Sequence, residues 1–180
     1  MRIRLLLLEL LAKRRLLRWS RDRSQADLAT FRKPKIAGNP HFLTRGFWYF
    51  INATIFNSSL LSLLPSQVKV FILKLFGAKV GHGIVIRPRV SIKSPWFVEI
   101  GDHVWIGEYV WIDNHTTVRI GSNSCISQGA YLFTGNHDWS DPSFSFFCKP
   151  VEIGEGVWVT AFVRVPPGSK IPDGVALLSE

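Results

Sequence analysis

Histidine is the residue type in this sequence best suited to proton transfer, because the ordinary pKa of imidazole, about 6.5, lies close to neutrality. Five histidines occur among the 180 residues. His137 lies in the polar segment TGNHDW between two periodic apolar stretches, and loops on rigid scaffolds often carry active sites. We therefore take His137 as the candidate general base. His115, in DNHTT, is expected to be a solvated corner residue; His82 and His103 are expected at the surface, and His41 lies outside the periodic region.

The cysteines argue against a disulfide scaffold or a zinc site. The chain has two, Cys125 and Cys148, and neither belongs to a Cys-x-x-Cys or Cys/His zinc spacing. A reducing compartment is the default expectation for such a chain.

The element that must position His137 is a sequence repeat of six residues. Each unit begins with an aliphatic residue, and a glycine often follows it. The aliphatic positions are Val80, Ile86, Ile92, Ile100, Ile106, Ile112, Ile120, Ile126, Leu132, Ile153, Val159, Val165, Ile171 and Leu177. Six residues suffice for a short strand and a corner, and three corners close one coil, so the repeat predicts a solenoid. The aliphatic side chains should stack inside it, and the glycines should ease the corners.

Interruptions of the repeat locate the insertions. The spacings from Val80 to Ile100 and from Ile100 to Ile120 are 20 rather than 18, so these coils each carry two extra residues at a corner. The spacing from Ile120 to Ile153 is 33, which predicts a protruding loop at about 133–149. A β-sandwich, the alternative mainly-β fold, would not keep one phase over so many units.

Two segments in this region resemble a known family. They are WIGEYVWIDNHTTVRIGSNSCISQGAYLFTGNHDWSDPSF and KPVEIGEGVWV. They resemble the colanic-acid-type sugar O-acetyltransferases, a subgroup of the hexapeptide-repeat acyltransferases, and the resemblance covers about residues 44–175. It implies a mainly-β fold, a left-handed parallel β-helix of about five coils, which assembles as a homotrimer. It also implies acetyl-CoA as co-substrate, no metal, and direct acetyl transfer to a sugar hydroxyl of a surface polysaccharide or its lipid-linked precursor.

The resemblance also implies roles for individual residues. His137 matches the catalytic position of the family. Asn114 either hydrogen-bonds the acceptor sugar or is a corner residue with positive φ. Asn136 and Asp138 flank His137 and could orient it or the acceptor, and Trp139 either walls the acceptor site or anchors the loop.

The donor site is implied by the motif match near the C-terminus. Trp158 would pack along the pantetheine arm, Ala161 would offer a backbone amide, and Ser179 would be its equivalent one coil later. Thr160 stands where the family commonly has glycine, so the donor site departs from the pattern here. The chain stops at Glu180, where the family continues, and we expect a truncated product with weak acetyl-CoA affinity.

The helical patterns and the start of the repeat divide the chain into a basic arm (1–43), a helical cap segment (44–79) and the coils (80–180). Residues 1–35 have a net charge of +8, whereas the rest has +1, so no nucleic-acid surface is expected. The Leu-rich arm is either an amphipathic helix on anionic lipid or a poorly ordered extension. The uncharged stretch Phe47–Leu64 is expected to form short helices rather than a membrane span, because polar residues dilute it.

Two other functions share parts of this pattern. A metal-dependent carbonic anhydrase would have the same fold, but it needs histidines in one coil column, and the spacings here form none. A structural or ice-binding solenoid would need a flat regular face, which this sequence lacks. The expected location is the cytoplasm, with the inner face of the membrane as an open alternative.

Overall fold

A computed structural model of the chain describes residues 27–179. It contains two compact units. The smaller unit comprises the described residues 27–32 together with 138–145, and the larger comprises residues 33–137 together with 146–179.

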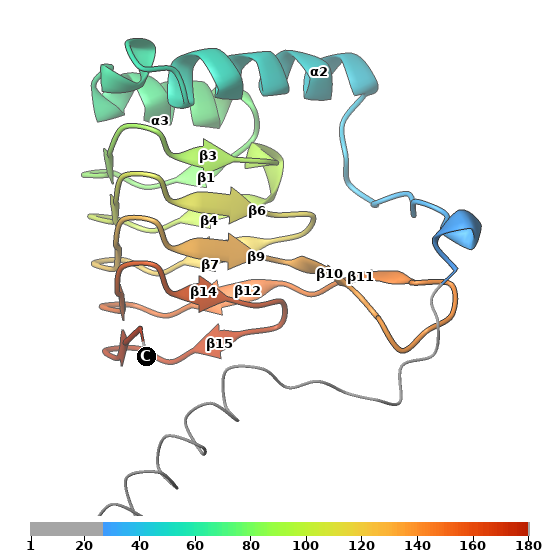
Figure 1. Cartoon of the computed structure of the whole chain (residues 1–180). Coiled ribbons are helices and arrows are strands. Elements are labelled where there is room, and N and C mark those ends of the chain that lie inside the picture. The colour runs from blue at the N-terminus through green and yellow to red at the C-terminus, as the bar shows by residue number, and fades with distance from the viewer. Residues whose placement is uncertain (1–26, 180) are drawn as a thin grey trace, which may run out of the picture. The chain divides into compact units, whose positions relative to one another are not determined.

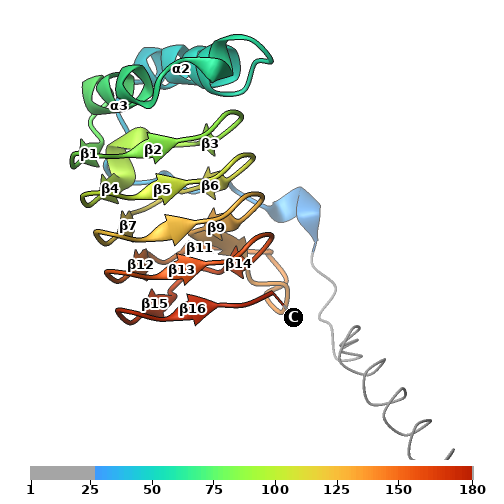
Figure 2. The ribbon, with the colours of Figure 1, turned by 90° about the vertical axis from the view of Figure 1, so that its left-hand side faces the viewer.

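The larger unit is a parallel β-helix with three faces, each formed by one sheet (Figures 1 and 2). The first sheet contains β1 (Lys79–Val80), β4 (Val98–Ile100), β7 (Val118–Ile120), β12 (Val151–Ile153) and β15 (Lys170–Ile171). The second contains β2 (Val85–Ile86), β5 (Trp105–Ile106), β8 (Cys125–Ile126), β13 (Trp158–Val159) and β16 (Ala176–Leu177). The third contains β3 (Ser91–Ile92), β6 (Trp111–Asp113), β9 (Tyr131–Phe133) and β14 (Arg164–Val165).

The register of these strands confirms the six-residue phase. Val80 pairs with Ile100, which pairs with Ile120, and the other two faces stack their aliphatic residues in the same way. These side chains form one continuous buried core along the axis. In Figure 2 the strands of the second sheet face the viewer and run from left to right as the coils descend, which is a left-handed path.

The glycines that follow the aliphatic residues have a different role from the one expected. Gly121 does not have a positive φ, but a Cβ there would lie 2.5 Å from the carbonyl carbon of Gly154 in the next coil. Glycine is therefore needed because neighbouring coils approach closely at this position. The left-handed corner conformation falls two residues later, for example at His103 and Asn123, with φ of 55° and 58°.

A layer of helices lies over the first coil (Figure 1). It comprises α2 (Phe42–Ile51), a π-helical turn (Asn52–Phe56), a 3₁₀ turn (Leu61–Leu63) and α3 (Ser66–Leu75). The Trp48 indole N–H donates to the Ile92 carbonyl at 2.9 Å, and Asn52 bonds the Ile92 amide at 3.2 Å. Lys69 from α3 is buried and donates to the Ile86 carbonyl at 3.1 Å. Among residues 27–179, none of the helices has the length and apolar character that crossing a membrane requires.

The outward side chains of the sheets differ in kind from face to face. The first sheet presents alternating charges, Lys79, Glu99, Arg119, Glu152 and Lys170. The second presents mostly apolar side chains, Val85, Trp105, Cys125, Trp158 and Ala176. Charged ladders suit a face exposed to solvent, whereas exposed apolar columns suit a contact with another molecule.

The smaller unit is built from local hydrogen bonds. Its 3₁₀ turn (Leu28–Thr30) is capped by Asp27, whose carboxylate accepts from the Ala29 amide at 3.0 Å. The Asp27 amide donates to the Pro142 carbonyl at 2.8 Å. The amphipathic helix expected at the start of the arm falls on residues 1–26, outside the described part of the chain.

Candidate active site

His137 lies at the end of a strand that leaves the coils after β9. The antiparallel pair β10 (Gly135–His137) and β11 (Phe146–Cys148) carries it, and His137 is directly opposite Phe146 (Figure 1). The Asn136 side-chain oxygen accepts from the His137 amide at 2.8 Å. This hydrogen bond holds the backbone beside His137, and both roles expected of Asn136 stay predictions.

His115 is packed against the same aromatic ring and is not the solvated corner residue that the sequence suggested. The centroid of the Phe146 ring lies 5.2 Å from that of His137 and 4.9 Å from that of His115. The side chain of His115 is 17% exposed. The His115 and Thr116 amides both donate to the Thr134 hydroxyl, and these two hydrogen bonds turn the corner inward.

A polar network adjoins His115. Lys93 donates to the Asp113 carboxylate at 2.7 Å, and its Nζ lies 2.8 Å from Nε2 of His115. Burial and the neighbouring Lys93 lower the pKa of His115, so its imidazole is neutral at pH 7 and Nε2 accepts from Lys93. Tyr131 donates to the same carboxylate at 3.0 Å, and burial together with Asp113 raises the pKa of Tyr131 to about 12.

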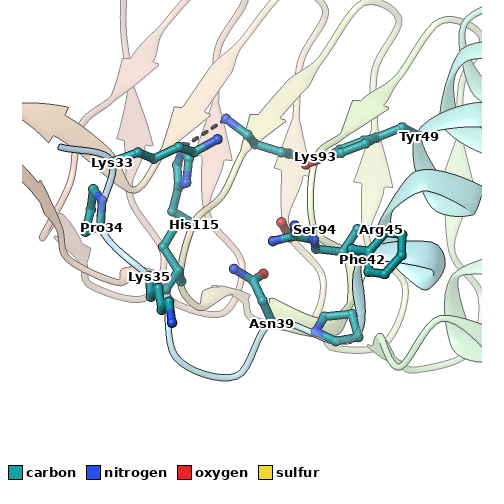
Figure 3. Close-up of a pocket in the computed structure, with 12 residues that line it drawn as sticks. Lys33, Pro34, Lys35, Asn39, Phe42, Arg45, Tyr49, Lys93, Ser94 and His115 are labelled. Atoms are coloured by element: carbon teal, nitrogen blue, oxygen red, sulfur yellow. Dashed lines mark hydrogen bonds between the residues drawn. The ribbon is translucent and has the colours of Figure 1, made fainter. Parts of the chain in front are cut away.

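A cavity of about 500 Å³ opens beside this network (Figure 3). Lys93, Ser94 and His115 form the side contributed by the coils. The segment before α2 and the first turns of that helix form the other side, with side chains that include Lys35 and Arg45. This volume is in the range of small-molecule sites.

Asn114 contributes neither of the two roles expected for it. Its side chain is fully buried, its oxygen accepts from the Ser94 amide at 3.0 Å, and its nitrogen donates to the Ser94 carbonyl at 2.7 Å. Its φ is not positive. The residue therefore joins equivalent corners of two coils inside the solenoid, where an acceptor sugar cannot reach it.

We expect Asn114→Ala to lower the free energy of unfolding by about 3 kcal/mol, because a buried N–H and a buried C=O of Ser94 lose their partner. Urea denaturation followed by circular dichroism measures the change. The exposed Asn123→Ala is not a suitable control, because Asn123 has a positive φ; the exposed Asn136→Ala serves better. Equal loss in both variants would contradict the structural role.

Asp138 and Trp139 belong to the smaller unit. The Asp138 carboxylate accepts from the Ser140 hydroxyl and, at 2.9 Å, from the Ser140 amide, and these hydrogen bonds lower the pKa of Asp138. Asp138 is thus an ionised carboxylate that closes a tight turn. The Trp139 side chain is exposed, and its two expected roles stay predictions.

The residues expected at the donor site gather on the last two coils. Thr160 donates to the Leu177 carbonyl at 2.7 Å and accepts from the Ser179 amide at 3.2 Å. The Ser179 amide is therefore occupied, whereas the Ala161 amide has no hydrogen bond to any other described residue. The exposed Trp158 indole N–H donates to the Ser127 hydroxyl at 2.8 Å.

A comparison with known proteins decides the family. The chain is 38% identical over 151 residues to "Putative colanic acid biosynthesis acetyltransferase WcaF" of Escherichia coli (strain K12), covering 84% of this chain and 82% of that protein. The chain belongs to the hexapeptide-repeat acetyltransferase family. The protein of the same name from Shigella flexneri matches to the same extent. No protein-family profile matches the chain.

Solved structures agree with the hexapeptide-repeat fold. A hexapeptide-repeat-containing acetyltransferase of Vibrio cholerae O1 biovar eltor, in complex with acetyl coenzyme A, superposes with a TM-score of 0.68. The two chains are 19% identical, and the match covers 82% of this chain and 79% of the Vibrio chain. At this identity the similarity shows the fold alone.

Sequence reasoning missed several residues that surround the site of this acetyltransferase. Lys93, Asp113 and Tyr131 were not singled out, yet they form the network that contacts His115. The 20-residue spacing of the coils contained the signal, because Lys93 and Asp113 directly follow the paired residues Ile92 and Ile112. Within residues 27–179, no group of three or more His, Cys, Asp or Glu side chains is arranged to hold a metal ion.

Proposed function

We propose that the chain transfers an acetyl group from acetyl-CoA to a sugar hydroxyl during synthesis of a surface polysaccharide, with His137 as the general base. The observation that carries the proposal is the position of His137 on the hairpin that leaves the coils, in a chain 38% identical to a relative named as a colanic acid biosynthesis acetyltransferase. The acetyl coenzyme A bound by the Vibrio acetyltransferase supports the choice of donor. A reaction that consumes this donor belongs in the cytoplasm.

The proposed reaction needs one proton acceptor. The imidazole of His137 takes the hydroxyl proton as the sugar oxygen attacks the thioester carbonyl carbon. A new C–O bond forms, the C–S bond of the tetrahedral intermediate then breaks, and the CoA sulfur leaves with a proton returned by His137. Because the thioester is already activated, the enzyme does not need to form a covalent intermediate.

The donor would bind along Trp158 of β13 and the corner that follows with Thr160 and Ala161. The unused Ala161 amide would be directed to an amide oxygen of the pantetheine arm. A trimer would complete this groove with a neighbouring subunit. The apolar outward column of the second sheet, which includes the half-exposed Trp105 and Trp158, supports such a contact. Asn136 would lie on the acceptor side beside His137, and Asp138 and Trp139, which follow in the chain, stay predicted acceptor contacts.

Calorimetric titration of acetyl-CoA into the full chain tests the donor assignment. We expect Trp158→Ala to weaken binding roughly tenfold, because an exposed indole that covers the pantetheine arm is lost. Trp111→Ala is the matched control, since the two tryptophans are 53% and 48% exposed and lie on different faces. Equal affinities of the wild type and Trp158→Ala would contradict this donor site.

A further inference from the structure

The cavity beside His115 is lined by cationic side chains. Lys33 and Lys35 approach from the segment before α2, Arg45 from α2 itself, and Lys93 from the corner after β3 (Figure 3). No Asp or Glu is among the side chains that line it. A cavity of about 500 Å³ therefore combines four positive charges with no acidic side chain on its wall.

Most of these cations are not neutralised by the protein. Lys33, Lys35 and Arg45 form no ion pair with any residue in the described range 27–179. The Nε atom of Arg45 is buried and has no hydrogen-bond partner. This buried nitrogen carries a desolvation cost, and guanidinium groups bind phosphate with good geometry.

Helix α2 adds a second feature that favours an anion. Pro40 and Phe42, at the start of this ten-residue helix, line the cavity. The first backbone amides of a helix lack intrahelical partners and carry a partial positive charge. Together with Arg45 and the lysines, they make this end of the cavity electropositive.

We propose that this cavity binds a phosphate or diphosphate group attached to the acceptor sugar. The inference rests on the proposed function, because it assigns the substrate class of the same site. The volume exceeds that of a lone phosphate and leaves room for part of a sugar. His115 lines the cavity and shares the Phe146 ring with His137, so a sugar held by its phosphate would be directed toward the proposed base.

Two kinds of acceptor share this chemistry, a nucleoside diphosphate sugar and a lipid-linked diphosphate sugar. A third anion, the phosphate groups of acetyl-CoA, is the main competitor for the cavity. The residues assigned to the donor lie on the last two coils, whereas the cavity is formed by the helical layer and the first coils, which favours the acceptor.

Titration calorimetry of the full chain with inorganic pyrophosphate tests the site without requiring acetyl transfer. We expect binding that weakens at least roughly tenfold in the double variant Lys35→Gln/Arg45→Gln, because two unpaired cations are lost. Lys74→Gln, an exposed lysine of α3, is the matched control and should leave binding unchanged. Thermal melting verifies that the variants are folded. If the double variant is unfolded, the single variant Lys35→Gln is tested in its place.

Three comparisons complete the experiment. UDP-glucose and a polyprenyl diphosphate-glucose in nanodiscs distinguish the two acceptor classes, and methyl glucoside, which lacks phosphate, should bind much more weakly than either. Undetectable pyrophosphate binding, or equal binding by the wild type and the Lys35→Gln variants, would overturn the proposal. Displacement of pyrophosphate by acetyl-CoA would also overturn it, since the cavity would then belong to the donor. Pyrophosphate binding without acetyl transfer would contradict the proposed function and not this site.

A separate observation concerns the outer side of the helical layer. Leu43, Phe47 and Phe50 recur at helical spacing along α2, and all are more than half exposed. Trp48 of α2 and Leu73 of α3 are fully buried on the opposite sides of their helices. The apolar stripe of α2 therefore points away from the coils, and the exposed Phe71 and Leu75 of α3 form a similar stripe.

The charges around these stripes match an anionic partner. The helical layer, residues 42–75, contains Arg45, Lys69 and Lys74 and no Asp or Glu, and Lys74 is exposed beside Leu75. We infer that the outer face of α2 and α3 lies on an anionic lipid surface, with its apolar side chains in the headgroup boundary. Apolar burial and cationic attraction together drive such binding.

Vesicle co-sedimentation of the full chain tests this inference. We expect binding to phosphatidylglycerol–phosphatidylcholine vesicles that falls roughly tenfold in Phe47→Ser/Phe71→Ser, because two exposed aromatic rings are lost. Trp111→Ser, which removes an exposed aromatic side chain from the coils, is the control. Unchanged binding in the double variant would assign the membrane contact elsewhere in the chain and overturn the inference. If the double variant loses oligomers and keeps its vesicle binding, a second copy of the chain covers this face. That result would also overturn the inference.

Discussion

His137→Ala should lower the turnover number of acetyl transfer by roughly 10²–10⁴-fold, the usual contribution of a positioned general base. The thioester would remain reactive, but the attacking hydroxyl would lose its proton acceptor. Because the proposed donor site lies on the last two coils, away from His137, the Kd for acetyl-CoA should stay close to that of the wild type. Release of the CoA thiol in the presence of acceptor measures the rate, and calorimetry measures the Kd.

His82→Ala is the matched control for this experiment. The imidazole of His82 is 75% exposed and pairs with Asp102 at 2.8 Å at a corner of the first coil. Its loss should leave turnover unchanged. Turnover by folded His137→Ala within a few-fold of the wild type would remove His137 from the role of base, whereas equal losses in both variants would indicate a general effect on the fold.

Lys69→Ala should lower the free energy of unfolding by about 3 kcal/mol, because several buried acceptors lose their donor at once. The ammonium group donates to the carbonyls of Ser62, Ile86 and Arg87 at 2.6, 3.1 and 3.3 Å. It thereby joins the 3₁₀ turn, α3 and the first coil. Burial, with a smaller effect from Arg87, lowers the pKa of Lys69, so the protonated form is retained at a cost that these hydrogen bonds offset.

Lys74→Ala provides the comparison within the same helix. Lys74 is exposed, and its removal should change the unfolding free energy by no more than about 0.5 kcal/mol. Urea denaturation of both variants, followed by circular dichroism, gives the two values. If Lys69→Ala unfolds at the same urea concentration as Lys74→Ala, Lys69 does not hold the helical layer on the coils.

The sequence predicted the structure best where a residue type recurs at a fixed spacing. An aliphatic residue such as Ile106 faces inward in every coil, so its burial follows from phase alone. The sequence predicted where glycines follow the aliphatic residues, but the expected role in easing the corners was wrong. Gly121 is required because it closely approaches Gly154, and this depends on the distance between coils, which no local sequence pattern contains.

The corners with inserted residues were the hardest part to predict. Asn114 and His115 are neighbours in the chain. His115 was expected to be a solvated corner residue, and Asn114 was expected to contact the acceptor sugar or to be a corner residue with positive φ. The structure buries the Asn114 side chain because it bonds Ser94 one coil away, and it packs His115 against Phe146 from a hairpin. Such burial is set by contacts between successive coils and insertions, and a polar corner sequence gives little indication of it.

Mass spectrometry of the surface polysaccharide tests the central claim most directly. Three strains are compared, one with the wild-type gene, one without the gene and one with His137→Ala. Our account predicts sugar units with an added acetyl group in the first strain and their loss in the other two, with the His137→Ala protein present at the wild-type level. The same acetylation in all three strains would contradict the proposed reaction, and acetylation retained by His137→Ala alone would contradict the role of His137.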